Sequence, residues 1–238
     1  LTHFIMHILV TGGAGFIGGH LADFFIDAGH DVTTLDILEP FYDLGLKEHN
    51  IDVARQRATE TDGSYEFIEG STTDTKLVND IVEDIDVIYH QAAQAGVRAS
   101  VEEPTKVTEY NISGSQTILE AARKHDVTRV VNASSSSVYG KPEYLPYDEA
   151  HPNEPVSPYG ASKLAVEHYM RVYNEVYGLQ PSHSAISPST VPECDRIWRS
   201  ATSFRDVCAA NPQRSTAMEP RHGTSHISPI SLTPITAC

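Results

Sequence analysis

The sequence predicts a doubly wound α/β fold, in which helices cover both faces of a parallel β-sheet. Short apolar runs alternate with longer amphipathic stretches as far as residue 179, a glycine-rich turn follows the first run, and an acidic residue ends the second. Such alternation is typical of βαβ units, whose crossovers are right-handed. We therefore expect the strand order 3-2-1-4-5.

Residues 6–18 are the segment around which the chain is organised. Residues 8–10 (Ile-Leu-Val) form an apolar run, as expected of a central strand covered on both faces. Gly12 permits a tight turn, Gly15 lets backbone amides approach a pyrophosphate, and Gly18 lets the next helix pack close to the strand. The segment predicts a strand, a phosphate-binding turn and a helix whose N-terminus attracts anions.

A glycine-rich turn alone is weak evidence, because many turns contain glycine. Here a second strand, residues 31–36, ends in Asp36, which lies 21 positions after Gly15. A carboxylate at about this spacing binds the ribose hydroxyls in a Rossmann dinucleotide site. Asp36 would repel a ribose phosphate, so we expect NAD rather than NADP. The alternative is a solvated acid at the end of a strand.

The rest of the chain continues the pattern. Helices are expected over residues 17–28, 47–60, 74–83, 104–125 and 157–177, and further strands over 65–69, 86–90 and 129–134. The loop at 37–46 is expected to lie over the cofactor. The small residues at 91–96 leave room for a ligand, or for close helix packing.

Composition limits the possible functions. The 238 residues are 40% hydrophobic, enough for one large domain or two small ones, and their net charge of −15 argues against nucleic-acid binding. No run is long enough to span a membrane and no secretory pattern opens the chain, so we expect a cytoplasmic protein. The acid-rich composition suggests a high-salt, halophilic source. Residues 1–5 precede Met6 and are expected to lie upstream of the natural start.

A candidate catalytic group lies near residue 160. Tyr159 and Lys163 are four positions apart, which places them on one face of a helix. A nearby ammonium and the cationic nicotinamide of NAD would favour the phenolate, making Tyr159 a general base. Ser135, at the end of the fifth strand, is placed to bond the reacting hydroxyl. Lys163 could also hold the nicotinamide ribose.

These features together resemble a known family, the nucleotide-sugar epimerases of the extended short-chain dehydrogenase/reductase superfamily. The matching pieces are Thr11-Gly-Gly-Ala-Gly-Phe-Ile-Gly18, Asp36, His90-Gln-Ala-Ala93, Asn111 with Gly114, Ala133-Ser-Ser-Ser-Ser-Val-Tyr-Gly140 and Ser157-Pro-Tyr-Gly-Ala-Ser-Lys163. They cover nearly all of residues 6–179, the predicted NAD-binding domain, in the family's order and spacing.

The resemblance implies an NAD-dependent epimerase of UDP-sugars that uses no metal. Its catalytic residues would be Ser135, Tyr159 and Lys163. Its cofactor-binding residues would be Gly12, Gly15, Phe16, Ile17, Gly18, Asp36, Ala92, Ala93, Asn111, Tyr159 and Lys163. Tyr159 would take the proton of the 4-hydroxyl while hydride passes to NAD, and the ketone would turn over and recover the hydride on its other face. Family members dimerise through the helices at 104–125 and 157–177.

The resemblance also separates subtypes. Dehydratase relatives carry an Asp-Glu pair where this chain has Ser136 and Ser137, which favours an epimerase over a dehydratase or reductase. Residues 92–98 and 41–43 look most like UDP-glucuronate 4-epimerases, with UDP-glucose as the other candidate substrate. Ser71 replaces an adenine-contacting Asp, which puts NAD affinity in question. A non-catalytic NAD-binding remnant is the third possibility.

The resemblance stops at Gln180. Residues 180–238 contain 16 of Ser and Thr and seven of the 14 prolines, without a sustained helical or strand period. A shifted reading of the codons permits Arg-Tyr-Phe-Thr-Val-Tyr-Gly-Pro after Leu179, the strand that the family has there. We therefore predict that residues 180–238 are a frame-shifted, largely unstructured tail. The sixth strand and the substrate domain would be missing, and activity would be impaired.

Overall fold

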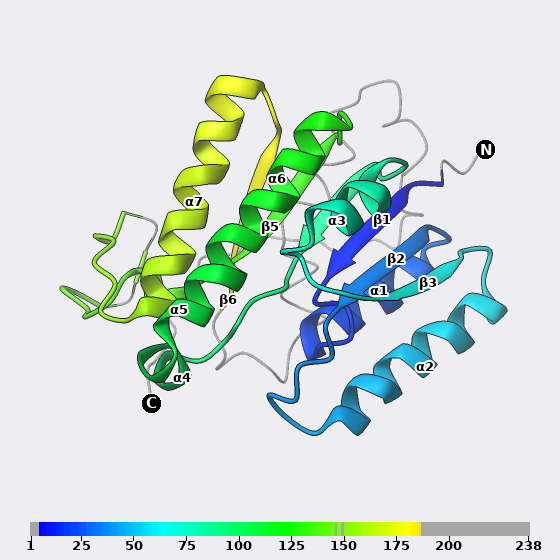
Figure 1. The fold of residues 1–238 in the computed structure, drawn as a ribbon, viewed down its shortest axis with the longest axis horizontal. Helices are drawn as coiled ribbons and strands as arrows, with labels where there is room; N and C mark the ends of the chain where they lie inside the picture. Colours follow the sequence, from blue (N-terminus) through cyan, green and yellow to red (C-terminus); the bar gives the residue numbers. More distant parts are fainter. Residues whose placement is uncertain (1–4, 146, 149, 187–238) are drawn as a thin grey trace, which may run out of the picture.

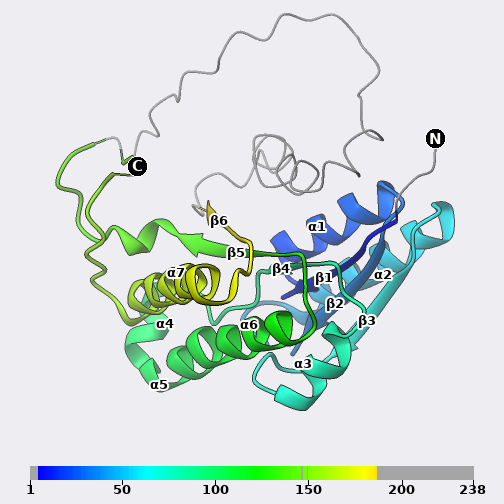
Figure 2. The same cartoon turned by 90° about the horizontal axis from the view of Figure 1, so that it is seen from above.

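The computed structural model describes residues 5–145, 147–148 and 150–186, which form one parallel sheet with helices on both faces (Figures 1 and 2). The strands are β1 (His7–Thr11), β2 (Asp31–Asp36), β3 (Tyr65–Glu69), β4 (Val87–His90), β5 (Arg129–Ser135) and β6 (Pro181–Ile186). The α-helices are α1 (Phe16–Asp27), α2 (Leu44–Glu60), α3 (Thr75–Val82), α4 (Val97–Glu102), α5 (Pro104–Val107), α6 (Gly114–Lys124) and α7 (Pro158–Tyr177). A π-helical turn, η1 (Thr108–Ser113), and a 3₁₀ turn, η2 (Ser136–Val138), complete the elements.

The strand order is β3-β2-β1-β4-β5-β6, so the predicted order of the first five strands is confirmed. β1 pairs with β2 on one side and with β4 on the other, and Thr11 is opposite His90 in the second pairing. The order of the strands along the chain reverses between β1 and β4. In open α/β sheets ligands bind at this switch point, beyond the carboxyl ends of the strands.

Strand β1 buries its two faces against different helices. Leu9 packs with residues of α3, α6 and α7, whereas Ile8 and Val10 pack with residues of α1 and α2. Figure 2 shows α1 on one side of the sheet and α3 and α6 on the other. Because successive side chains of a strand point to opposite faces, the apolar run of β1 is buried throughout, as predicted.

The helix predicted at 104–125 is confirmed, and it contains a π-helical turn that the sequence did not predict. It is divided into α5, η1 and α6, because a π-turn interrupts the α-helical hydrogen-bonding pattern. Such turns bulge the backbone locally and often occur at functional sites. The turn carries Asn111 toward the segment at 91–96.

No helix of the described residues is both long and apolar enough to cross a lipid bilayer.

The prediction that the sixth strand is missing is wrong. Gly178, with a φ of +73°, ends α7 and turns the chain back beside β5, where Pro181–Ile186 pairs in parallel with residues 130–135. Pairing at a sheet edge uses backbone groups, so it makes little demand on side chains. Residues 187–238, the remainder of the predicted tail, lie outside the described residues, as do residues 1–4.

Candidate functional site

A pocket of about 490 Å³ opens at the carboxyl ends of β1, β2, β4 and β5. Its wall includes every predicted site residue except Asn111: Gly12, Gly15, Phe16, Ile17, Gly18, Asp36, Ala92, Ala93, Ser135, Tyr159 and Lys163. The structure therefore brings the glycine turn, the acid of β2 and the Ser-Tyr-Lys group around one cavity. Phe41 and Tyr42 from the loop after β2 also line it, as expected of a loop that lies over a ligand.

The glycine turn has the close contacts that require glycine. A Cβ on Gly18 would lie 2.2 Å from the carbonyl oxygen of Gly12, and Gly12 itself has a φ of +68°. Gly15 caps α1 without a side-chain hydrogen bond, and the first turn of that helix contains no acidic residue. The amides at this helix end are therefore positioned to attract an anion. The Tyr42 hydroxyl accepts a hydrogen bond from the Phe16 amide.

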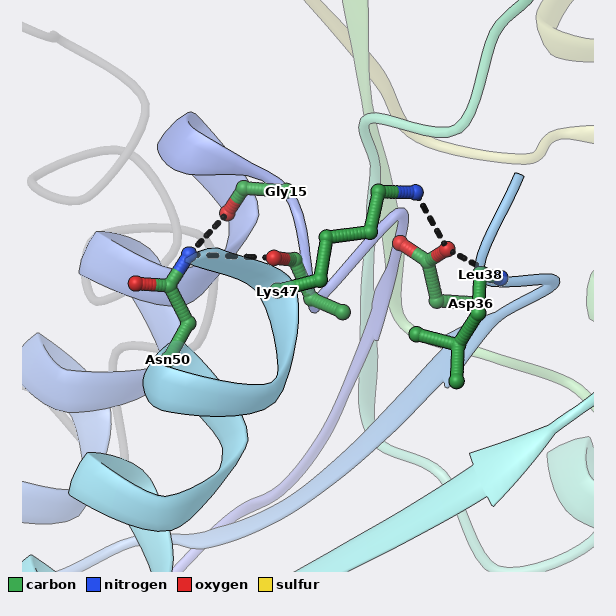
Figure 3. Close-up of polar contacts among 6 residues, drawn as sticks. Gly15, Asp36, Leu38, Lys47 and Asn50 are labelled. Carbon is green, nitrogen blue, oxygen red and sulfur yellow. Dashed lines mark hydrogen bonds and ion pairs between the residues drawn. The ribbon is translucent and has the colours of Figure 1, made fainter. Parts of the chain in front are cut away.

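Helix α2 supports both the turn and the acid of β2, and Figure 3 shows these contacts. The Asn50 Nδ2 donates to the carbonyl oxygens of Ala14 at 3.0 Å and Gly15 at 3.4 Å. The Lys47 Nζ lies 3.0 Å from Asp36 Oδ1, which also accepts a hydrogen bond of 2.8 Å from the Leu38 amide. Sequence reasoning missed Lys47 and Asn50. Their only local signal is a three-residue spacing on one helical face.

Ser135 and Tyr159 meet at the end of β5. Ser135 is 4% exposed, Tyr159 is half-buried, and their hydroxyls share a hydrogen bond. Burial raises the pKa of the Tyr159 phenol, and the hydrogen bond with Ser135 opposes that rise. Desolvation of the phenolate is the larger of the two effects. A lowering of this pKa by Lys163 together with the nicotinamide cation stays a prediction.

Lys163 is fully enclosed behind the two hydroxyls. It is 4% exposed, and its Nζ donates to the carbonyl oxygen of Ala133 at 2.9 Å. Burial lowers the pKa of Lys163 to about 8, so the side chain still carries a charge at pH 7. Burial, together with the charge of Lys163, lowers the pKa of His90 to about 3. Lys163 is therefore a cation in the pocket wall, and the nearby buried imidazole of His90 is neutral.

Asn111 lies behind the pocket wall and not on it, contrary to its predicted place among the cofactor contacts. Its Oδ1 accepts from the Gln94 amide at 2.7 Å, and its Nδ2 donates to the Gln94 carbonyl at 3.2 Å and to Ser162 Oγ at 2.9 Å. Ser162 in turn donates to the carbonyl oxygen of Tyr159. The amide is saturated by protein groups, so Asn111 joins the 91–96 segment to the start of α7.

A further acidic side chain supports the end of β5. Glu167 follows Lys163 by one turn of α7 and accepts a hydrogen bond from the hydroxyl of Ser134, the residue before Ser135. Tyr159, Lys163 and Glu167 thus make three successive contacts along one stripe of the helix, to Ser135, Ala133 and Ser134. Sequence reasoning missed Glu167, although its four-residue spacing after Lys163 continues the stripe.

Comparisons with known proteins agree with this architecture. A family model described as GDP-mannose 4,6 dehydratase matches residues 9–203. A putative UDP-glucose 4-epimerase of Methanocaldococcus jannaschii is 43% identical over 175 residues, which are 73% of this chain and 52% of the relative. A probable UDP-glucuronate 4-epimerase of Rhizobium meliloti is 36% identical over 72% of this chain and 50% of its own length. The chain spans about half the length of the curated relatives it matches.

The chain is also similar to solved structures of UDP-sugar 4-epimerases. The UDP-glucuronic acid 4-epimerase of Bacillus cereus, in complex with UDP-glucuronic acid and NAD, superposes with a TM-score of 0.67 at 32% identity, over 75% of this chain and 55% of that one. The UDP-glucose 4-epimerase of Brucella ovis in complex with NAD has a TM-score of 0.64 at 32% identity, over 75% and 50%. The chain therefore belongs to the GDP-mannose 4,6 dehydratase family, among the extended short-chain dehydrogenases/reductases, as the resemblance predicts.

Proposed function

We propose that the chain derives from an NAD-dependent 4-epimerase of UDP-glucuronate or UDP-glucose and retains its coenzyme site. The observation that carries this proposal is the meeting of Ser135, Tyr159 and Lys163 at one end of a pocket whose other end is the glycine turn. A phosphate-binding turn accounts for a nucleotide. A phenol beside a buried ammonium accounts for proton transfer at the reacting carbon.

The pocket fits NAD by the chemistry of its wall. The uncapped amides of α1 would hold the pyrophosphate, and Asp36 would accept from the adenosine ribose. Gln91 lines the pocket, and its buried side-chain amide has no hydrogen-bond partner among the described residues. Such a group indicates that a ligand completes the site. When bound, NAD supplies the acceptor for the hydride that leaves the sugar's C4.

The reaction then follows from the protein's own groups. Tyr159 takes the proton of the 4-hydroxyl through its phenolate, and Ser135 holds both hydroxyls in line by hydrogen bonding. Because burial raises the pKa of Tyr159, the phenolate needs the positive charge of Lys163 and of the oxidised nicotinamide nearby. After the ketone has turned over, C4 would recover the hydride on its other face while Tyr159 returns the proton. No net oxidation results, so no external oxidant is consumed.

The choice between substrates rests on similarity. Relatives described as UDP-glucose and as UDP-glucuronate 4-epimerases both match the chain, and residues 41–43 and 92–98 favour the glucuronate type. A dehydratase or reductase is the second candidate, supported by the family model's description. Ser136 and Ser137, in place of an Asp-Glu pair, argue against a dehydratase. A non-catalytic NAD-binding remnant is the third candidate.

We further infer that residues 180–238 come from a shifted reading frame and impair the enzyme. The support is their composition and the family-like strand that the shifted codons permit after Leu179. The family model's match continues past codon 179 to residue 203, so the inference rests on the composition and the shifted codons alone. Sequencing the gene across codon 179 tests this. An intact frame through the region contradicts it.

The proposed activity is tested with the purified chain. We expect NAD to bind with one equivalent per chain, and UDP-glucuronate and UDP-glucose to be interconverted with their C4 epimers slowly or not at all, as followed by NMR without added oxidant. A robust rate contradicts the impairment. Accumulation of a 4-keto product or of NADH supports the second candidate. NAD binding without turnover, even after the frame is restored, supports the third.

The proposal also covers the oligomeric state, the cellular location and the salt environment of the protein. Val172, Val176 and Tyr177 of α7 are exposed, as expected of a helix that packs against a second copy. We expect a cytoplasmic homodimer without nucleic-acid or membrane partners, which light scattering and filter binding test. The net charge of −15 predicts that salt stabilises the fold. Unfolding that is independent of salt concentration contradicts a halophilic origin.

A further inference from the structure

The negative charge of Asp36, the acid expected to select NAD, is already compensated by the positive charge of Lys47. Its Oδ1 lies 3.0 Å from the ammonium of Lys47, and both residues are 7% exposed while lining the pocket wall. The side chain of Lys47 extends from α2 toward Asp36 on the edge of β2 (Figure 3). A close ion pair presents little net charge to a ligand, so repulsion by Asp36 alone would be too weak to exclude a ribose phosphate.

The geometry assigns different tasks to the two oxygens of Asp36. Oδ1 accepts from Lys47 and from the Leu38 amide, at 3.0 Å and 2.8 Å. Oδ2 accepts no hydrogen bond from any residue in the described part of the chain. With Oδ1 held on two sides, the carboxylate cannot rotate freely, and Oδ2 is left to accept from ribose hydroxyls. Lys47 is thus positioned to fix the orientation of the acceptor.

We propose that Lys47 determines coenzyme selection in this chain, as a positioning residue that holds Asp36 and as a cation that a ribose phosphate would use if Asp36 were uncharged. This proposal rests on the proposed dinucleotide site and deepens it. Asp36 masks Lys47: the carboxylate satisfies the ammonium and occupies the space next to it. Loss of the carboxylate charge leaves a buried cation at the place where NADP carries its extra phosphate.

Asn50 provides the comparison that distinguishes a role in coenzyme selection from a purely structural role. It lies one turn after Lys47 on α2 and bonds the carbonyls of the glycine turn, which would face the pyrophosphate shared by NAD and NADP. If Lys47 only tied α2 to the sheet, its removal would weaken both coenzymes alike, as removal of Asn50 should. If Lys47 acts on the ribose end, the ratio of the two affinities changes.

The test measures dissociation constants of NAD and NADP by titration calorimetry on the full chain. The variants are Asp36→Asn, Lys47→Met, Asp36→Asn with Lys47→Met, and Asn50→Ala. Lys76→Met, at an ion pair of α3 where the lysine side chain is 87% exposed, is the matched control for loss of a charge. Asp36→Asn keeps the shape of the side chain and an acceptor for Lys47, which protects folding; circular dichroism checks each variant.

We expect Asp36→Asn to bind NADP about tenfold or more tightly than the unmodified chain, since charge-assisted hydrogen bonds contribute that much. The added Lys47→Met substitution should abolish this gain. Lys47→Met alone should raise the NAD-to-NADP preference, because an unpaired Asp36 repels phosphate. Asn50→Ala and Lys76→Met should leave the preference unchanged.

Two results overturn the inference: an NADP gain that persists in the double variant, or a Lys47→Met preference equal to that of the unmodified chain. The second result decides the matter even if Asp36→Asn fails to fold. Failure of the unmodified chain to bind either coenzyme refutes the proposed function instead, and is thereby distinguished.

Discussion

The half of the pocket formed by β1, α1, β2 and α2 differs from the half formed by β4, β5, η1 and α7 in how its charges are placed. In the first half, which we name the coenzyme half after its proposed ligand, Lys47 is paired with Asp36 and glycines allow close backbone approach. In the catalytic half, Lys163 forms no ion pair within the described chain and donates to a peptide carbonyl. A buried ammonium without a counter-ion is costly to the free energy of folding, which is why such groups mark functional sites.

The contrast extends to what each half can bind. Lys47 and Lys163 are the only cations in the pocket wall that the described residues form, and each already has a partner. The helix end of α1 would bind one pyrophosphate. A nucleotide sugar brings a second one, for which the described part of the wall supplies no cation. The coenzyme half therefore has its cation paired within the wall, whereas a UDP-sugar in the proposed catalytic half would need cationic groups that the described wall does not supply.

The largest expected effect comes from supplying those groups. A chain translated in the alternative frame from codon 180 onward should turn over UDP-sugars at least about a thousandfold faster than the present chain, because positioning of the reacting carbon contributes that much or more. Its affinity for NAD should change little. Coupled assays and NAD titrations on both chains test this, and equal turnover would remove the distinction between the two halves.

Within the catalytic half, Tyr159→Phe should be the most damaging single change. In the frame-restored chain we expect kcat to fall by roughly 10²- to 10⁴-fold, the usual contribution of a general base, with NAD affinity unchanged. Tyr169→Phe, at an exposed position of α7, is the control for loss of a hydroxyl. A kcat for Tyr159→Phe within about threefold of the parent would show that the phenol is not the base.

The buried imidazole of the catalytic half predicts a pH effect on stability. The pKa of His90 is about 3 in the folded protein, well below its ordinary value, so the unfolded chain binds the proton more readily. Stability is retained above about pH 6.5 and should fall by about 2 kcal/mol between pH 6.5 and 4.5 through this group.

Denaturant titrations of the parent, His90→Gln and the exposed control His168→Gln measure the effect. His90→Gln should flatten the acid limb, whereas His168→Gln should not. Identical pH dependence in all three proteins would show that His90 is not the acid-sensitive group.

The smallest expected effect concerns the support of β5. Glu167→Ala removes the acceptor of the Ser134 hydroxyl and should lower the free energy of unfolding by about 1 kcal/mol, as for a hydrogen bond to a charged group that is partly solvated. Glu175→Ala, at an exposed position of the same helix, should change it by less than about 0.5 kcal/mol. Equal losses in the two variants would mean that the Ser134 contact contributes nothing.

Local patterns predicted the fold well because they arise from local physics. The apolar run at residues 8–10, the glycine spacing and the position of Asp36 each follow from one strand or turn, and the structure places them as expected. The π-turn within the 104–125 helix was not predicted; it carries Asn111 to Gln94 in another segment, and no local pattern indicates that contact. The β6 strand was missed because edge pairing depends on backbone groups, which carry no side-chain pattern.

The sequence by itself determined the strand order, the phosphate-binding turn and the Ser-Tyr-Lys group, because periodicity and short spacings encode them. Only the tertiary structure decided that Lys47 neutralises Asp36, that Asn111 lies behind the wall, and that Tyr159 has a raised pKa. These facts depend on burial and on contacts between elements distant in the chain. Desolvation and ion pairing exist only once the elements have packed, so no local pattern contains them.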